Sequence, residues 1–160
     1  MKRIDLMVGG QLQKTRVRVF YFSKSGNTRK VAEAIADEMN TEALEAEAVG
    51  SGYNMKKCDL LFVGSGNYLS GPGKAMVEFI EGIEPAEDRH AAIFGTSGGS
   101  GKKYLEKMEE LLEKKGIGVL GKWDCPGQEF SLKNRGRPNE EDLSEARDFA
   151  KKMLKKIEIV

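Results

Sequence analysis

Short apolar runs alternate with amphipathic stretches along most of this chain, and that alternation limits the possible folds more than any other feature. The runs are rich in β-branched and aromatic residues, and they predict strands at 17–22, 60–63, 91–94 and 117–123. Between them, apolar residues recur at helical spacing and predict helices at 28–39, 74–82, 102–115 and 139–157. A weaker alternation within 41–49 predicts an edge strand.

Strands that alternate with helices form a parallel sheet with helices packed on both of its faces. The five predicted strands fit the smaller doubly wound α/β architecture, a three-layer fold with strand order 2-1-3-4-5. We therefore expect residues 1–160 to form a single domain. Ile4, Leu6 and Val8 alternate with polar residues before two glycines, so we expect residues 1–15 to add a short extra strand or hairpin.

Charge and composition exclude several classes of function. Lys and Arg number 26 and Asp and Glu 25, so the formal net charge is +1 and gives no global field for nucleic acid or an anionic membrane. No apolar run approaches the roughly 20 residues of a membrane span, and none resembles a signal-peptide core, so we expect a cytoplasmic protein without membrane insertion. Cys58 and Cys125 form no C-x-x-C motif and His90 is the only histidine, which argues against a disulfide framework or a metal site.

Glycine is the unusual component, with 19 residues in 160, against an average share of about 7 %. Three Gly/Ser/Asn-rich segments directly follow predicted strands, at 23–28, 64–73 and 95–101. In a parallel α/β sheet, ligands bind beyond the carboxyl ends of the strands at the switch point of the topology. Strand-to-helix turns favour Gly and Ser in any case, so the prediction of a binding site rests on three such loops meeting at one edge.

The first of these loops, Ser23-Lys24-Ser25-Gly26-Asn27-Thr28, leads from a strand into a helix. Free backbone N–H groups and the helix dipole favour an anion at such a position. The hydroxyl and amide side chains add donors, and Gly26 permits a positive φ and a close approach of the backbone. The loop therefore predicts a phosphate site, with a plain Ser/Thr helix cap as the alternative.

Sharper catalytic motifs fail when they are tested residue by residue. The nucleotide P-loop pattern has Thr96 in place of its first glycine and Lys103 in place of Ser or Thr. The dinucleotide pattern that begins at Gly64 ends on Leu69 instead of glycine. The segment 95–99 matches the G-x-S-x-G nucleophile elbow, but His90 precedes it, at the far end of the same predicted strand. We therefore predict no catalytic side chain.

The segment 19–28, Val-Phe-Tyr-Phe-Ser-Lys-Ser-Gly-Asn-Thr, resembles the opening strand and phosphate loop of flavodoxins, which bind flavin mononucleotide (FMN). Gly64-Ser65-Gly66-Asn67-Tyr68 resembles their second flavin loop, and Phe94-Gly95-Thr96 resembles the start of the third. Residues 136–143 resemble the entry to the last helix, so the likeness extends over about residues 16–157. The first loop is its specific part. The resemblance implies a flavodoxin-like fold with FMN as the cofactor.

The resemblance also implies a role for each loop. The phosphate would be held by the first loop, with residues Ser23, Lys24, Ser25, Gly26, Asn27 and Thr28. The second loop would flank the flavin ring with Ser65, Gly66, Asn67, Tyr68, Leu69 and Gly71, and Tyr68 would be its stacking partner unless it is a core aromatic. The third loop would contact the pyrimidine edge of the ring through Thr96, Ser97, Gly98, Gly99 and Gly101.

Two departures from the family pattern bear on function. The third loop has no aromatic residue, and the nearest is Tyr104, so one face of the ring is expected to be open to a second substrate. Lysines at 24, 74, 102 and 103 replace the acidic surroundings typical of flavodoxin carriers, and they would stabilise a reduced, anionic flavin.

Three hypotheses follow from these features. The first is an FMN protein that carries electrons between redox partner proteins. The second is a small FMN-dependent oxidoreductase that acts on NAD(P)H and a quinone or dye. The third is a phosphate-binding or partner-binding module that holds no flavin.

Overall fold

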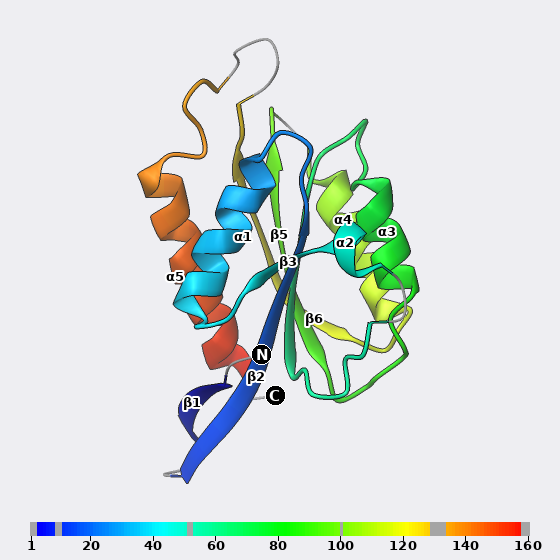
Figure 1. The fold of residues 1–160 in the computed structure, drawn as a ribbon, viewed down its shortest axis with the longest axis vertical. Helices are drawn as coiled ribbons and strands as arrows, with labels where there is room; N and C mark the ends of the chain where they lie inside the picture. The colour runs from blue at the N-terminus through cyan, green and yellow to red at the C-terminus, as the bar shows by residue number, and fades with distance from the viewer. Residues whose placement is uncertain (1–2, 9–10, 51–52, 100, 129–133, 158–160) are drawn as a thin grey trace.

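The computed structural model describes residues 3–8, 11–50, 53–99, 101–128 and 134–157. Strands and helices follow one another in an alternating α/β order (Figure 1). In chain order they are β1 (Arg3–Val8), β2 (Gln11–Phe22), α1 (Asn27–Glu38), β3 (Ala43–Glu45), α2 (Ala46–Val49), β4 (Leu60–Gly66), α3 (Lys74–Glu81), β5 (His90–Ser97), α4 (Lys103–Glu113), β6 (Gly118–Pro126) and α5 (Glu140–Lys156).

Five of the strands form a parallel sheet in the order β3-β2-β4-β5-β6. Counted along the chain without β1, this is the predicted order 2-1-3-4-5. β1 pairs antiparallel with the first half of β2, from Arg3 opposite Arg16 to Val8 opposite Gln11. This hairpin projects beyond the amino ends of the parallel strands (Figure 1).

Helices α1 and α5 cover one face of the sheet, and α3, α4 and the short α2 cover the other (Figure 1). Every residue of the central strand β4 is buried, as expected for a strand with helices on both sides. Its side chains alternate between two cores. Leu61 and Val63 join the core beneath α3 and α4, whereas Leu60 and Phe62 join the core beneath α1 and α5. Helices packed on both faces of the sheet therefore fix the carboxyl end of β4 and the loop that follows it.

Several predicted boundaries differ from the structure. β2 begins at Gln11, β4 continues past Val63 to Gly66 and β5 continues past Phe94 to Ser97, so the first residues of two glycine-rich segments belong to the strands. The segment 41–49 contains a three-residue strand, β3, which pairs with Val19 to Tyr21 of β2, and the chain then turns into α2. The last strand continues past Trp123 to Pro126, since β5 pairs with it up to Ser97. That extension carries the end of β6 to the same level as the ends of β4 and β5.

Part of the glycine excess serves packing within the sheet. A Cβ on Gly64 would lie 2.0 Å from the ring of Phe94, and one on Gly95 would lie 2.5 Å from the ring of Tyr104. Both rings are fully buried. These two glycines make room for aromatic side chains and do not by themselves indicate a ligand.

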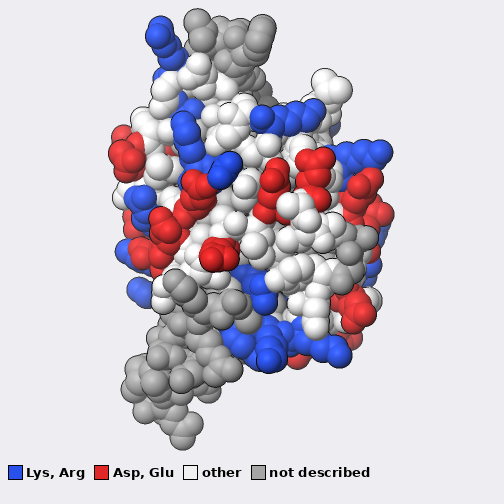
Figure 2. Space-filling model, viewed as in Figure 1, with Lys and Arg blue, Asp and Glu red and all other residues white. Residues whose placement is uncertain are grey.

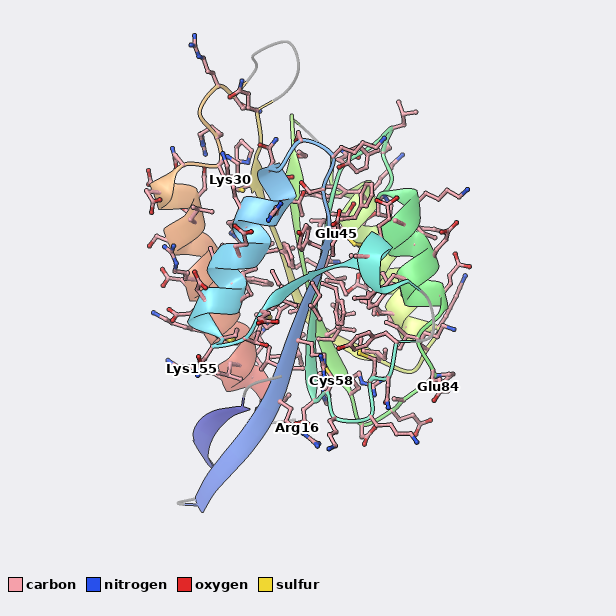
Figure 3. The ribbon with its side chains drawn as sticks, in the orientation of Figure 1. Arg16, Lys30, Glu45, Cys58, Glu84 and Lys155 are labelled. Atoms are coloured by element: carbon pink, nitrogen blue, oxygen red, sulfur yellow. The ribbon has the colours of Figure 1, made fainter. Side chains whose placement is uncertain are left out.

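Charged side chains of both signs are interspersed over the helices on the face seen in Figure 2, as a net charge near zero allows. Figure 3 shows side chains filling the layers between sheet and helices, with Arg16, Cys58 and Glu84 toward the amino end of the sheet. Within the described part of the chain, no helix is long and apolar enough to cross a membrane.

Candidate functional site

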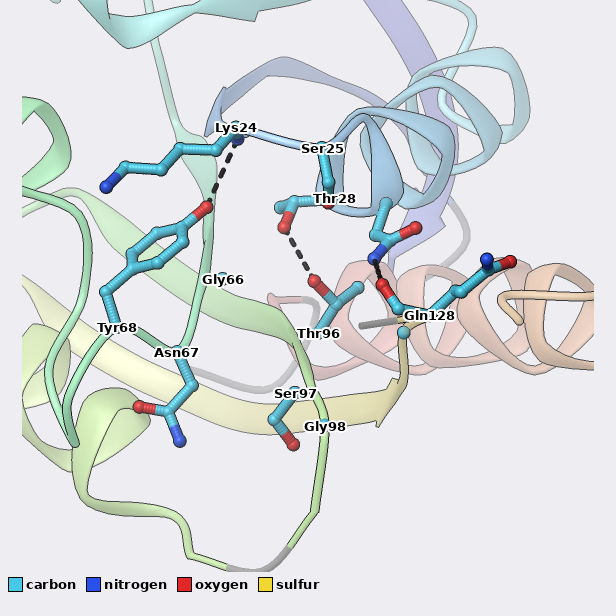
Figure 4. A pocket seen from close by; sticks show the side chains of 12 residues that line it. Lys24, Ser25, Thr28, Gly66, Asn67, Tyr68, Thr96, Ser97, Gly98 and Gln128 are labelled. Carbon is cyan, nitrogen blue, oxygen red and sulfur yellow. Dashed lines mark hydrogen bonds between the residues drawn. The ribbon is translucent and has the colours of Figure 1, made fainter. Parts of the chain in front are cut away.

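A cavity of about 480 Å³ opens at the carboxyl edge of the sheet, where the loops after β2, β4, β5 and β6 meet (Figure 4). Its volume is in the range of small-molecule sites, roughly 300–1,000 Å³. It is lined by Lys24, Ser25, Asn27, Thr28, Gly66, Asn67, Tyr68, Thr96, Ser97, Gly98, Gly127 and Gln128. Hydroxyl, amide and glycine residues therefore make up most of its wall.

The β2–α1 loop brings a helix N-terminus to this cavity. Gly26 stands at the N-cap of α1 with φ 94°, and its N–H donates to Ser23 Oγ at 3.0 Å. No side chain caps α1, and the first-turn N–H groups of a helix have no intrahelical acceptor. Asn27 and Thr28 of that turn both line the cavity. This end of the cavity is thus suited to an anion.

Hydrogen bonds between neighbouring loops hold the floor of the cavity. The Oγ1 atoms of Thr28 and Thr96 lie 2.7 Å apart, and both side chains are almost fully buried. The N–H of Asn67 donates to the Thr96 carbonyl at 3.1 Å, and the N–H of Gly127 donates to the Ser97 carbonyl at 3.0 Å. The ends of β4, β5 and β6 and the start of α1 are therefore linked to one another.

Tyr68 forms one wall and joins the second loop to the first. Its hydroxyl accepts the backbone N–H of Lys24 at 3.2 Å, and Lys24 Nζ lies 4.7 Å from the centre of its ring (Figure 4). The ring also meets the edge of Phe22, with centroids 5.8 Å apart. A Cβ on Gly66 would lie 2.7 Å from the Tyr68 hydroxyl oxygen. Burial raises the pKa of Tyr68, so its hydroxyl stays neutral at physiological pH.

One lining residue has an unsatisfied polar atom. Asn67 Oδ1 is buried and has no hydrogen-bond partner among the described residues. A buried acceptor in this state costs about 1–3 kcal/mol relative to a satisfied one. A ligand that places an N–H group beside Asn67 would remove that cost.

Ten of the predicted site residues line the cavity and seven do not. The ten are Lys24, Ser25, Asn27, Thr28, Gly66, Asn67, Tyr68, Thr96, Ser97 and Gly98. Ser23 and Gly26 lie outside the lining and shape the turn above it. Ser65 is fully buried, and its Oγ donates to the Gly66 carbonyl and accepts the Gly73 N–H, each at 2.8 Å. Its hydroxyl therefore bonds within the chain and does not face the cavity. The remaining four are Leu69, Gly71, Gly99 and Gly101.

The loop after β6 was missed by the sequence analysis. Gly127 and Gln128 line the cavity, and the Gln128 carbonyl accepts Asn27 Nδ2 at 2.9 Å. A Cβ on Gly127 would lie 2.7 Å from Asn27 Nδ2, so glycine permits this approach. Asn134 Nδ2 donates to the carbonyls of Gly98 and Gly127, at 3.0 and 3.4 Å. The available signal was topological, since all parallel strands of one sheet end at the same edge.

The surroundings of the cavity are less basic than the four lysines at 24, 74, 102 and 103 suggested from the sequence. Among the described residues of the lining, Lys24 is the only charged one. Lys102 forms an ion pair with the buried carboxylate of Asp124, and Lys74 lies 3.8 Å from Glu78. Asp124 also accepts the Tyr104 hydroxyl at 2.9 Å. Burial and the Asp124 charge both raise the pKa of Tyr104, which is fully buried and is not available for stacking on a ligand.

Other reactive groups do not form a catalytic arrangement. Burial raises the pKa of Cys125 to about 12 and that of Cys58 to about 11, so both thiols are protonated at neutral pH. Ser97 closes β5 and donates to the Gly99 carbonyl, whereas His90 opens the same strand at its other end. The described residues contain no cluster of three potential metal ligands.

Comparison with known proteins places this architecture in a family. A family model described as a flavodoxin domain matches residues 18–135. The chain is 32 % identical over 138 residues to the uncharacterized protein MJ0298 of Methanocaldococcus jannaschii, covering 81 % of this chain and 91 % of that protein. It is 28 % identical over 176 aligned positions to the flavodoxin-like domain-containing protein BilS of Clostridioides difficile, covering 89 % and 98 %.

Among solved structures, oxidised flavodoxin 1 from Bacillus cereus superposes with a TM-score of 0.70 at 19 % identity, covering 88 % of this chain and 98 % of that one. At that identity the superposition shows a shared fold, while the family model covers most of the chain. The strand order and the helical layers agree with this match. The chain therefore belongs to the flavodoxin family.

Proposed function

We propose that this protein binds FMN in the cavity at the carboxyl edge and carries electrons between redox proteins. The observation that carries the proposal is the pairing of two unlike ends within one 480 Å³ cavity. An uncapped helix N-terminus with hydroxyl and amide side chains lies at one end, and an aromatic wall at Tyr68 lies at the other. A ligand with a phosphate at one end and a flat heteroaromatic ring at the other matches these two ends of the cavity. The cytoplasmic location expected from the sequence is part of this proposal.

The first loop would bind the phosphate with neutral donors. Ser25, Asn27 and Thr28 supply hydroxyl and amide groups beside the first-turn N–H groups of α1. Anions bind at such positions through the free N–H groups and the helix dipole together. Lys24 adds one positive charge at the rim, and its backbone N–H is engaged by Tyr68.

The second and third loops would hold the ring. Gly66, Asn67 and Tyr68 lie on one side of the cavity, and Ser97 and Gly98 lie on the other (Figure 4). Asn67 Oδ1 lacks a partner and would accept a ring N–H. FMN supplies the electron chemistry when it is bound, so the protein needs only to bind, orient and shield it. This agrees with the lack of an acid–base constellation among the described residues of the site.

A second candidate is an FMN-dependent oxidoreductase that acts on NAD(P)H and a quinone or dye. The observation that favours it is the burial of Tyr104, the aromatic residue nearest to the third loop. Because Tyr104 does not line the cavity, no aromatic side chain among the described residues of this region covers it opposite Tyr68. A ring held against Tyr68 alone would leave its other face open to a small second substrate.

Titration with FMN and riboflavin tests the proposal. We expect visible flavin absorbance to remain with the protein after desalting, and FMN to bind more tightly than riboflavin. A protein that takes up neither flavin would refute both flavin functions and favour the flavin-free binding module. Steady NAD(P)H oxidation with a quinone and no second protein would favour the oxidoreductase over the carrier.

A further inference from the structure

Leu69 is exposed in a way that the fold does not explain. It is fully exposed, and among the described residues it is the only large hydrophobic side chain in that state. Its φ is 54° and that of Ser70 is 66°. Tyr68 and Gly71 exchange both backbone hydrogen bonds, at 2.8 and 3.1 Å, so these two residues form a tight hairpin turn. Such turns favour Asn and Gly, and a bulky residue at positive φ is costly.

The position of this turn links it to the cavity. Tyr68, the first residue of the hairpin, lines the cavity, and the next residue carries the exposed side chain. Leu69 therefore stands at the mouth of the proposed FMN site and packs on none of the described residues. Its strain and its exposure are both unfavourable for the isolated protein, whereas contact with another molecule would bury its apolar surface.

The loops around the mouth carry one sign of charge. Their described residues (23–26, 67–73, 98–99, 101–102, 127–128 and 134–139) include four cationic side chains and no Asp or Glu. In the helices that these loops enter, Lys74 and Lys103 lie at the starts of α3 and α4, whereas Glu140, Glu141 and Asp142 lie in the first turn of α5. Lys102, Arg137 and Lys74 have carboxylate partners, but Lys24, Lys103 and Arg135 have none within 4.0 Å among the described residues. Several of the Lys and Arg side chains in Figure 2 lie toward this upper end.

We propose that the redox partner docks over this mouth with an acidic face, and that an apolar recess in that face receives Leu69. The inference rests on the proposed electron transfer and adds the chemistry of the partner. A charged rim accelerates encounter and sets orientation, while an apolar contact inside it supplies affinity. The arrangement at this mouth has both parts, one exposed leucine and a rim with three cations that have no carboxylate within 4.0 Å among the described residues.

The test uses FMN-loaded, chemically reduced protein and three electron acceptors of different charge. Rubredoxin is the acidic protein probe, cytochrome c the basic one, and benzoquinone a small neutral control. We expect the rate constant with rubredoxin to fall as salt increases and that with cytochrome c to rise. Faster transfer to cytochrome c than to rubredoxin at low salt, with the opposite salt dependence, would overturn the proposal.

Paired charge variants separate the local rim from the net charge. Lys103→Glu with Arg135→Glu should lower the rubredoxin rate by roughly tenfold at low salt, the lower end of electrostatic steering effects. Lys56→Glu with Lys57→Glu is the matched control, because it changes the net charge equally at the amino edge of the sheet, where both lysines are exposed. Equal losses in the two double variants would show a net-charge effect and overturn docking at this mouth.

Leu69→Asn tests the apolar contact without straining the turn. Asparagine suits a positive φ, so we expect the melting temperature to stay the same or rise while the rubredoxin rate falls several-fold and the benzoquinone rate is unchanged. An unchanged rubredoxin rate would remove Leu69 from the interface. The parent protein could also form a dimer that Leu69→Asn dissociates, while the rubredoxin rate stays unchanged. In that case Leu69 contacts a second copy of this chain, and the proposed partner is overturned.

The controls distinguish this inference from the function on which it rests. A protein that takes up no FMN refutes the proposed function and this inference together. FMN uptake and normal benzoquinone reduction, combined with the wrong salt dependence, refute only the acidic partner.

Discussion

The two ends of the parallel sheet each carry a cavity, and the comparison shows why volume alone does not indicate a site. The cavity at the amino edge is the larger, about 590 Å³ against about 480 Å³ at the carboxyl edge. Its polar groups serve the fold. Arg16 donates three hydrogen bonds to Asp59, and the buried Arg89 donates to the carbonyls of Cys58 and Met55.

Charge separates the two cavities further. Arg89 Nη1 lacks a hydrogen-bond partner among the described residues, but Glu84 and Asp88 line the same amino-edge cavity and oppose an anion there. Among the described residues, the carboxyl-edge lining contains no Asp or Glu and presents hydroxyl, amide and helix-terminal donors. A donor set with no competing carboxylate among its described residues, and not the amount of empty space, is what distinguishes the proposed site.

The largest predicted effect removes donors from the carboxyl edge. Ser25→Ala with Thr28→Val should weaken FMN binding by about 3 kcal/mol, roughly a hundredfold in Kd, because hydrogen bonds to a charged group contribute about 1.5–3 kcal/mol each. Riboflavin, which lacks the phosphate, serves as the control ligand in the same fluorescence titration. Equal losses of affinity for FMN and riboflavin would show that the first loop does not bind the phosphate.

A Cβ at Gly66 should disturb the same cavity by steric means. Gly66→Ala places a methyl group 2.7 Å from the Tyr68 hydroxyl oxygen, so the ring must shift, at a cost of about 1–3 kcal/mol. We expect FMN and riboflavin to lose affinity by similar factors. Gly71→Ala is the matched control in the same loop, since its nearest neighbour would be 3.8 Å away. Equal affinities for the two variants would show that Tyr68 does not position the ring.

At the amino edge, Asp59→Asn should change stability without changing flavin binding. Burial opposes ionisation of Asp59, but the hydrogen bonds from Arg16 outweigh it and lower the pKa of the carboxyl. Its contribution is therefore present above the unfolded value near 3.8 and is lost as pH falls through the folded pKa. We expect the variant to lose about 1 kcal/mol at pH 7 in urea unfolding, and the difference from the parent to shrink at pH 3. A loss of FMN affinity in this variant would instead show that the amino edge of the sheet affects the proposed FMN site at the carboxyl edge.

The smallest effect is expected at Cys125, which is buried at the end of β6. Because its pKa is raised to about 12, the thiol stays protonated between pH 7 and pH 9 and should react only slowly with Ellman's reagent in the folded protein. Cys125→Ser should leave the FMN affinity within about twofold, a change of roughly 0.4 kcal/mol. Rapid labelling that FMN blocks would place this thiol in the site.

The sequence predicted the architecture well because its main signals are local. Apolar runs such as 60–63 and helical stripes such as that of α5 arise from neighbouring residues, and the strand order 2-1-3-4-5 was confirmed. Three of the loops that form the cavity were also identified, since each directly follows a strand. Ser65 was assigned to the cofactor from its place in a motif, yet its hydroxyl is committed to Gly66 and Gly73.

Contacts between distant segments decided the rest. Gly127 and Gln128 join the cavity only because β6 pairs with β5 up to Pro126, and Tyr104 is removed from it because Asp124 accepts its hydroxyl beneath Gly95. The same carboxylate pairs with Lys102 and reduces the basic rim. The sequence by itself determined the layers, the sheet edge and the polar, glycine-containing loop that leads into α1, because periodicity and turn chemistry are local. Which side chains face the cavity, and which charges remain unpaired around it, was decided only by the tertiary structure, because burial and ion pairing depend on residues far apart in the chain.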